Sequence, residues 1–335
     1  MKTITLSSQG KGLEKLQITQ KDRPSPKSGE VLIKWHATSL NYHDYLVAIG
    51  AIPVPNGRIP MSDGAGEIVE IGPDVMEYKV GDKVMSLFFP GWLEGEPRFE
   101  KIVGISGETI DGYMAEYSCL SQKAVTIIPN NYSYAEASTL PCAALTAWNG
   151  LMNTGKLQAG QSVLIEGTGG MSLFGLQFAK AAGANVFATT SSPEKAERLK
   201  TLGAEFVVNY KEDNRWGKTI FKQSNGGVDH VLDVGGGSTM KQSIEAARIG
   251  GFITAIGILG NGRKGEITFP KLFFKFITMK GIAVGNKRMQ EQMVKTINAT
   301  NIKPIIDRSF GFNELADAFR YQESGKHFGK IVLEW

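Results

Sequence analysis

One stretch near the middle of the chain constrains the fold more than any other. An apolar run of strand type, Ser162–Glu166, leads directly into the glycine-rich turn Gly167–Ser172, and a helical run, Leu173–Ala182, follows and ends at Gly183. A buried strand, a tight turn and a helix in this order are typical of a unit that holds a pyrophosphate at the helix N-terminus. The sequence therefore predicts a parallel sheet built around this turn.

The glycines of this turn have separate tasks. Gly167 permits the tight turn, and Gly169 lets the backbone approach the pyrophosphate. The third position of the strict G-x-G-x-x-G Rossmann pattern is Ser172, so the motif is imperfect, with Gly175 one turn later. The strand and helix on either side of the turn support the Rossmann interpretation.

Strands and helices continue to alternate after this motif. Strand–helix alternation at short spacing predicts a doubly wound parallel sheet. The expected strands are Asn185–Thr189, Phe206–Val208, Val228–Val234 and Phe252–Ile258, and the expected helices begin at Ser192 and cover Trp216–Gln223 and Thr239–Arg248.

The first 126 residues have a different character. Short runs of β type, punctuated by glycine and proline, predict a rolled-up, partly open barrel. The segment 90–111 has no clear periodicity. A loop of that length is often a lid or binding element, and an ordinary surface excursion is the alternative.

Composition narrows the class of protein. A length of 335 residues predicts about two domains. Two cysteines, Cys119 and Cys142, exclude a disulfide framework or a four-cysteine zinc site and indicate an intracellular protein. The net charge of +4 comes from dispersed residues, so neither nucleic acid nor a membrane is an expected partner. No signal peptide or apolar span is evident, and we expect a cytoplasmic protein.

The choice of cofactor is expected about 20 residues after the turn, where NAD enzymes carry an acid for the ribose hydroxyls. Here the strand ends at Thr189–Ser192 without a carboxylate. Hydroxyl groups at a helix N-terminus, with Lys195 and Tyr210 near, suit a 2′-phosphate and predict NADPH. The alternative is that Ser191 and Ser192 only cap the helix and that Lys195 is a solvated surface residue.

Three motifs together resemble the medium-chain dehydrogenase/reductase superfamily, over essentially the whole chain: Asn41–Tyr45, Asp63–Val69 and Leu140–Trp148. The resemblance implies an α/β protein with a GroES-like, partly open β-barrel catalytic domain and an inserted doubly wound Rossmann sheet. The catalytic domain would comprise residues 1–126 and 285–335, and the dinucleotide-binding domain residues 127–284. Cofactor-binding residues are expected at Thr146, Gly167, Thr168, Gly169, Gly170, Met171, Ser172, Thr190, Ser191, Lys195, Tyr210, Gly235 and Gly257.

The resemblance also bears on zinc. Zinc alcohol dehydrogenases hold their catalytic metal with Cys, His and Cys, and the matching positions here are Asn41, Ser62 and Cys142. Neutral Asn and Ser oxygens are poor zinc ligands. The chain therefore resembles the zinc-free quinone oxidoreductase-like branch, and no metal is expected. Cys142 is either a small buried residue or part of the substrate pocket.

The branch implies hydride transfer from NADPH to a quinone or an α,β-unsaturated carbonyl. The catalytic candidates are Asn41, His43, Asp44 and Tyr45, although Asp44 also suits a helix start and Tyr45 also suits a core. Two rival interpretations are a zinc-assisted alcohol dehydrogenase using Cys142 with Asp63 or Asp44, and a non-catalytic NADPH-binding or NADPH-sensing protein. An expected edge strand at 277–284 predicts a homodimer.

Overall fold

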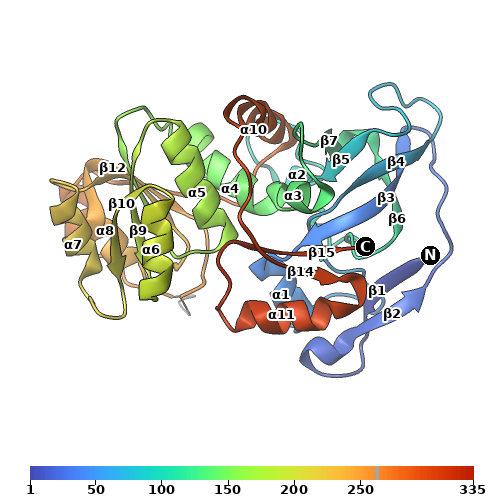
Figure 1. The fold of residues 1–335 in the computed structure, drawn as a ribbon, viewed down its shortest axis with the longest axis horizontal. Coiled ribbons are helices and arrows are strands. Elements are labelled where there is room, and N and C mark those ends of the chain that lie inside the picture. The colour runs from blue at the N-terminus through green and yellow to red at the C-terminus, as the bar shows by residue number, and fades with distance from the viewer. Residues whose placement is uncertain (261–263) are drawn as a thin grey trace. The chain divides into compact units, whose positions relative to one another are not determined.

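The structure is a computed structural model that describes residues 1–260 and 264–335, and the chain divides into two compact units (Figure 1). The first unit comprises Met1–Leu145 and Val284–Trp335, and the second comprises Thr146–Ala283. In the described residues, no helix combines the length and the apolar character that crossing a bilayer requires.

The second unit is a parallel six-stranded sheet with strand order β10-β9-β8-β11-β12-β13. This order reverses direction between β8 and β11, as in a doubly wound dinucleotide-binding sheet. Its strands are β8 (Ser162–Glu166), β9 (Asn185–Thr190), β10 (Ala204–Asn209), β11 (Val228–Asp233), β12 (Ala247–Ala255) and β13 (Thr278–Gly281). Its helices are α5 (Gly170–Ala181), α6 (Pro193–Thr201), α7 (Trp216–Gln223), α8 (Met240–Ala246) and α9 (Phe269–Phe274).

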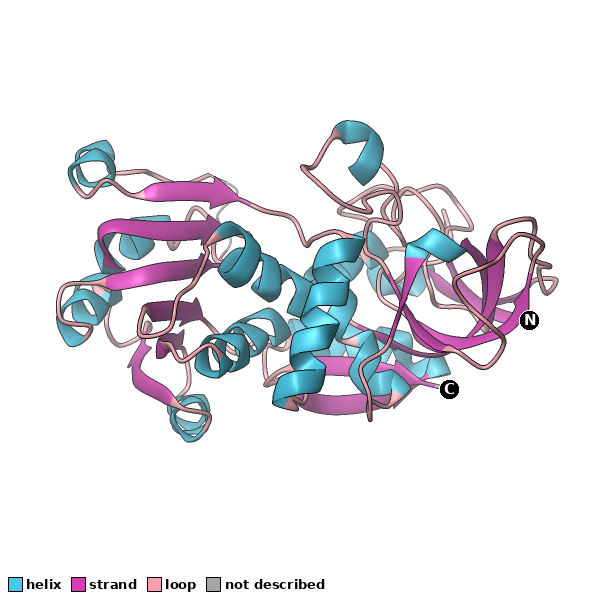
Figure 2. Cartoon of the chain, turned by 90° about the horizontal axis from the view of Figure 1, so that it is seen from above, coloured by secondary structure: helices cyan, strands magenta, loops and turns pink. Residues whose placement is uncertain are grey.

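Helices cover both faces of this sheet, because successive side chains of each strand point to opposite faces (Figure 2). Leu164 of β8 belongs to a buried cluster with Trp216 of α7 and Ile244 of α8. Its neighbour Ile165 lies instead beside Gly175 of α5. Burial on both faces explains why the strands read as continuous apolar runs.

The first unit is a mixed sheet with strand order β14-β15-β3-β4-β5-β7, in which β6 also pairs with β3, plus the separate hairpin pair β1-β2. The long strand β3 lies at its centre and pairs with β15, β4 and β6. The strands are β1 (Lys2–Leu6), β2 (Leu16–Gln20), β3 (Glu30–Ser39), β4 (Ala65–Ile71), β5 (Lys83–Ser86), β6 (Tyr117–Ser121), β7 (Val125–Ile127), β14 (Ile306–Gly311) and β15 (Lys330–Glu334).

The helices of the first unit are short, apart from α10. They are α1 (Tyr42–Ala48), α2 (Phe99–Ile102), α3 (Tyr134–Ser138), α10 (Lys287–Thr300) and α11 (Leu315–Glu323), with 3₁₀ turns η1 (Gly12–Lys15), η2 (Gln122–Ala124) and η5 (Phe312–Glu314). The two sheets agree with the predicted combination of a partly open barrel with a doubly wound parallel sheet.

The first unit extends to Leu145, beyond the predicted residue 126. The reason is that α3 packs against β3 and β4, so the chain leaves the first unit only after it. Beyond α3 the chain continues through wide π-helical turns, η3 (Leu140–Ala144) and η4 (Asn149–Thr154), on either side of α4 (Leu145–Trp148).

Candidate active site and cofactor site

The start of α1 gathers three of the four predicted catalytic residues. Asn41 precedes the helix, and its backbone N–H donates to Asp44 Oδ2 at 2.9 Å, which satisfies a group that the helix leaves unpaired. The other carboxylate oxygen of Asp44 accepts the Ser62 N–H at 2.8 Å. Asp44 is 1% exposed. It therefore ties the segment before β4 to the first turn of α1.

The Asn41 amide has its hydrogen bonds inside the protein. Its Nδ2 donates to Ser62 Oγ at 3.2 Å and to Asp63 Oδ2 at 2.9 Å, and its Oδ1 accepts from Lys330 Nζ at 2.7 Å. An amide nitrogen has two hydrogens, so both are engaged. In this arrangement Asn41 organises the cluster, and a hydrogen bond from it to a substrate would require one of these contacts to break.

Lys330 of β15 is a site residue that sequence reasoning missed. Its ammonium donates to the Leu40 carbonyl at 2.6 Å as well as to Asn41, and the side chain is buried. The pKa of Lys330 lies below its usual value, because burial outweighs the opposing influence of Asp63, Cys142 and Asp44. A signal was present: a lysine inside the apolar final strand is unusual unless it has buried partners.

Asp63 is the acidic residue that shares Asn41 as a hydrogen-bond partner with Lys330. Burial raises the pKa of Asp63 to about 7, against the opposing influence of Lys330. Its Oδ2 accepts from Asn41 and from Ser39 Oγ at 3.3 Å, whereas Oδ1 has no hydrogen-bond partner. Asn41 thus bridges the buried side chains of Asp63 and Lys330.

His43 is paired with Glu108 from the 90–111 segment. The His43 Nε2 lies 2.7 Å from Glu108 Oε2, and Nδ1 lies 3.6 Å from Asp44 Oδ1, which is ion-pair range but long for a hydrogen bond. Burial lowers the pKa of His43, but Asp44 and then Glu108 outweigh it and raise the pKa to about 9. With 19% of its side chain exposed, His43 is a partly accessible imidazolium at neutral pH.

Tyr45 lies apart from these residues. Its hydroxyl donates to Glu323 Oε1 at 2.6 Å, and its ring is 6.1 Å from that of Phe319, both on α11. The Glu323 hydrogen bond, followed by burial, raises the pKa of Tyr45 to about 12. The structure therefore does not bring Tyr45 together with Asn41, His43 and Asp44.

The second unit presents the predicted cofactor turn between β8 and α5. Gly167 has φ +74°, a conformation that L side chains rarely adopt, and no atom lies within 4 Å of a Cβ built on it or on Gly169. The Ser172 hydroxyl instead turns inward and donates to the Glu166 carbonyl at 2.6 Å. The turn is thus open on the side where a pyrophosphate needs backbone N–H groups, so this segment fits the anion.

Most predicted cofactor residues share one edge of this sheet, beyond the carboxyl ends of parallel strands. Ligands of open α/β sheets bind at that edge. Gly167, Thr168, Gly169, Gly170, Met171 and Ser172 follow β8, Thr190 ends β9, Ser191 and Lys195 follow β9, Tyr210 follows β10, Gly235 follows β11, and Gly257 follows β12. Thr146 lies in α4, at the first residue of the second unit, and is buried.

The β9–α6 junction contains no carboxylate before Glu194. Ser192 caps α6, since its Oγ accepts the Lys195 N–H at 3.3 Å. The capping role considered for Ser192 therefore holds. The Tyr210 N–H donates to the Thr190 carbonyl at 3.0 Å, which places the exposed Tyr210 beside this junction.

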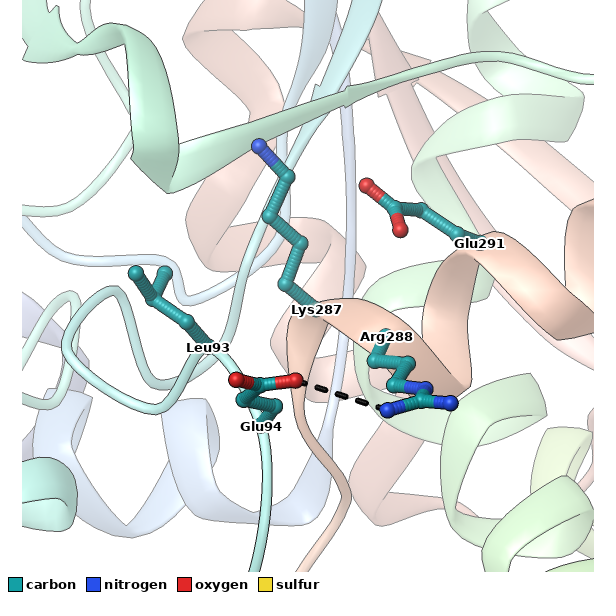
Figure 3. A pocket seen from close by; sticks show the side chains of 5 residues that line it. All are labelled: Leu93, Glu94, Lys287, Arg288 and Glu291. Atoms are coloured by element: carbon teal, nitrogen blue, oxygen red, sulfur yellow. Dashed lines mark hydrogen bonds and ion pairs between the residues drawn. The ribbon is translucent and has the colours of Figure 1, made fainter.

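A polar groove of about 340 Å³ lies between the 90–111 segment and α10 (Figure 3). Its two basic residues are in ion pairs, since Arg288 lies 3.5 Å from Glu94 and Lys287 lies 3.5 Å from Glu77. The first N–H groups of α10, on Lys287 and Arg288, donate to the carbonyls of Trp92 and Leu93. The groove therefore joins the segment to α10 and presents no unpaired helix N-terminus to a ligand.

Comparison with known proteins agrees with both units. The profile of the alcohol dehydrogenase GroES-like domain matches residues 27–130, and that of the zinc-binding dehydrogenase matches residues 170–299. A zinc-type alcohol dehydrogenase-like protein of Schizosaccharomyces pombe is 41% identical over 96% of this chain and 94% of its own length. The chain belongs to the medium-chain dehydrogenase/reductase superfamily.

Other members of the superfamily differ in what their names say they reduce or oxidise. An NADPH-dependent alkenal/one oxidoreductase of Arabidopsis thaliana is 30% identical over 92% of this chain and 73% of its own length. The quinone oxidoreductase from Coxiella burnetii has a TM-score of 0.81 and 28% identity, covering 100% of this chain and 99% of its own. As a superfamily member, this chain is an oxidoreductase that depends on a nicotinamide cofactor.

Proposed function

We propose that this medium-chain dehydrogenase/reductase uses NADPH to reduce an α,β-unsaturated carbonyl compound or a quinone, and that it does so without zinc. The observation that carries the proposal is that Asn41, which matches a metal-ligand position of zinc alcohol dehydrogenases, is held by hydrogen bonds to the buried side chains of Lys330 and Asp63.

The side chains at these positions do not suit a zinc ion. The Asn41 oxygen accepts from the Lys330 ammonium, and the Asn41 nitrogen donates to Ser62 Oγ. Zinc prefers thiolate and imidazole ligands, and a neighbouring ammonium repels a divalent cation. Among the described residues, no group of three or more His, Cys, Asp and Glu side chains is placed to hold a metal.

The β9–α6 junction supports NADPH over NADH. The absence of an acid between Thr190 and Ser192 removes the usual partner of the ribose 2′-hydroxyl and the usual repulsion of a 2′-phosphate. The hydroxyl groups of Ser191 and Tyr210 at this junction suit a phosphate. The NADPH-dependent relative of Arabidopsis thaliana is consistent with this choice.

When bound, NADPH supplies a hydride from C4 of its nicotinamide. Reduction of an enone or a quinone also requires a proton at the oxygen on which negative charge develops. His43 suits this task, because it is partly exposed and Asp44 and Glu108 keep its imidazole protonated at neutral pH. We assign it the proton-donor role, with Asp44 and Glu108 orienting the ring.

An anaerobic assay of NADPH oxidation with a panel of quinones, enones, aldehydes and ketones tests the proposal. We expect turnover with quinones or enones and little with saturated carbonyls. Turnover confined to aldehydes and saturated ketones would favour the alcohol dehydrogenase interpretation. Tight NADPH binding with no turnover of any acceptor would favour a binding or sensing protein.

A further inference from the structure

Two buried carboxyl groups lie on either side of one hydroxyl in the second unit. Glu166 ends β8, Asp233 ends β11, and Ser243 projects from α8. The Ser243 Oγ lies 2.8 Å from Glu166 Oε1 and 2.6 Å from Asp233 Oδ2. All three side chains are buried, with Glu166 4% exposed and the other two 0%.

This geometry requires a proton on the pair. A serine hydroxyl has a single hydrogen, so it donates to only one of the two carboxyl oxygens. The other contact is a hydrogen bond only if that carboxyl group is protonated and donates to Ser243. If both carboxyl groups were ionised, an oxygen of one of them would face the Ser243 oxygen with no hydrogen between the two atoms. The two carboxyl groups therefore hold one proton between them, in addition to the hydrogen of the Ser243 hydroxyl.

The surroundings favour the same state. Burial, followed by the charge of Asp233, raises the pKa of Glu166 to about 8, and burial also raises the pKa of Asp233. The groups that lower these two pKa values are all neutral hydrogen-bond donors. These are Ser243 from α8, Thr239 before α8, and the N–H groups of Val234, Gly235 and Gly236 in the loop after β11. None of these groups is a cation.

The remaining carboxyl oxygens hold the loop that follows β11. The Oε2 of Glu166 accepts the N–H groups of Val234 at 3.2 Å and Gly235 at 3.4 Å. The Oδ1 of Asp233 accepts the Gly236 N–H and the Thr239 hydroxyl, both at 2.8 Å. The loop is thus held from the same pair of side chains that shares the proton.

The pair occupies the point where the strand order of the sheet reverses. Strands β8 and β11 are neighbours in the sheet. The chain continues from β8 to β9 on one side of this pair and from β11 to β12 on the other. Dinucleotides bind in the crevice at such a switch point. A second negative charge there would face the anionic pyrophosphate and would disturb the loop beside it.

We propose that Glu166 and Asp233 are positioning residues that hold the 234–236 loop for the dinucleotide, and that the affinity for the dinucleotide depends on the single proton that they share. The proposal rests on nicotinamide dinucleotide binding alone and is independent of which acceptor is reduced. Ionisation of the pair at alkaline pH is then linked to release of the cofactor.

The test is the dissociation constant of NADPH, measured by fluorescence as a function of pH without any acceptor. We compare the wild type with Glu166→Gln, which is neutral at every pH, keeps an oxygen for the loop N–H groups and can donate to Ser243. Glu205→Gln makes the same change at an exposed position of β10 and serves as the matched control. Ionisation of NADPH itself is common to all proteins and cancels in the comparison.

For the wild type and Glu205→Gln, we expect the dissociation constant to rise about tenfold between about pH 7 and about pH 9.5, as the pair loses its proton. For Glu166→Gln it should change by no more than about twofold over that range. Parallel pH profiles for the wild type and Glu166→Gln would overturn the proposal. Asp233→Asn provides the same comparison if Glu166→Gln does not fold.

Infrared spectroscopy supplies a readout that needs no cofactor. At neutral pH the wild type should show the C=O stretch of a buried, protonated carboxylic acid that Glu166→Gln lacks, because the remaining Asp233 then ionises. If the wild type lacks this band, the shared proton is wrong, whatever the outcome of the acceptor panel. If the band and the pH-dependent binding are present but no enone or quinone turns over, the proposed function fails and this proposal stands.

Discussion

At the scale of single residues, Lys330 matters most to the proposed chemistry. Its ammonium donates to two oxygens, those of Leu40 and Asn41, and Asn41 matches a metal-ligand position of zinc alcohol dehydrogenases. It also opposes the charge of Asp63, which has one oxygen without a hydrogen bond. A buried charge is tolerated only with such partners.

Replacing this lysine should therefore cost stability. Lys330→Met keeps most of the side-chain volume but leaves Asn41 and Leu40 oxygens unpaired and Asp63 without its cation. We expect a loss of about 3–5 kcal/mol in the free energy of unfolding, measured by urea denaturation. Lys326→Met, at an exposed position, is the control. Equal stability of the two variants would show that the buried pair contributes nothing.

His43 and Glu108 give a prediction about pH. Because Asp44 and Glu108 raise the pKa of His43 to about 9, the imidazolium persists at neutral pH, and kcat should fall as pH rises through that value. In Glu108→Gln one of the stabilising charges is lost, so the fall should move down by about one pH unit or more. Glu94→Gln in the same segment is the control. An unchanged profile in Glu108→Gln would exclude His43 as the proton donor.

At the scale of elements, we expect the junction of β9 with α6 to determine the choice of dinucleotide. Ser191→Asp introduces the acid that NAD enzymes place here, and it faces a 2′-phosphate with a like charge. We expect KM for NADPH to rise about tenfold or more while use of NADH improves. Ser191→Asn has nearly the same shape without the charge and should leave KM nearly unchanged. A wild-type preference for NADH would contradict the cofactor assignment.

The sequence predicts well those helices and strands whose bounds are set by the pattern of their own residues. The strand Ser162–Glu166 and the helix Trp216–Gln223 occur at the predicted bounds, because a buried parallel strand and an amphipathic helix have distinct local patterns. The β-type run Tyr113–Tyr117 also suggests a strand, but β6 begins only at Tyr117. The N–H groups of Tyr113, Met114 and Glu116 donate to Met61, Pro60 and Lys2, so this run forms no regular ladder.

Within the candidate site, local motifs predict the course of the backbone better than they predict which side chains contact one another. The turn at Gly167 and the start of α1 at Asn41 follow from local sequence. Glu108 was not predicted, because no pattern in the 90–111 segment links it to His43, 65 positions earlier. The pairing of Glu166 with Asp233 also depends on β8 and β11 becoming neighbours, which is a property of the assembled sheet.

At the scale of the whole molecule, the free edge of the six-stranded sheet is the expected site of assembly. β13 is the outer strand, and the adjacent segment exposes Phe269, Phe273, Phe274 and Phe276 by 58–75%. Exposed apolar patches of this kind mark interaction surfaces, and a free strand edge favours a symmetric partner.

We therefore expect a homodimer. Light scattering at micromolar concentration should give twice the 36.4 kDa of the chain. Phe274→Glu should shift the protein toward the monomer, whereas Phe99→Glu, at an exposed position of α2, should not. A wild-type monomer at that concentration would argue against assembly through this edge.

The central claim is that the cluster of Lys330, Asn41 and Asp63 replaces zinc in a working reductase. The most direct measurement is the metal content of purified protein, by mass spectrometry, on the same sample in which NADPH oxidation by an enone or a quinone is followed with and without a chelator. We predict far less than one zinc per chain and unchanged turnover with the chelator. Near-stoichiometric zinc, with activity lost on chelation and restored by the metal, would contradict the claim.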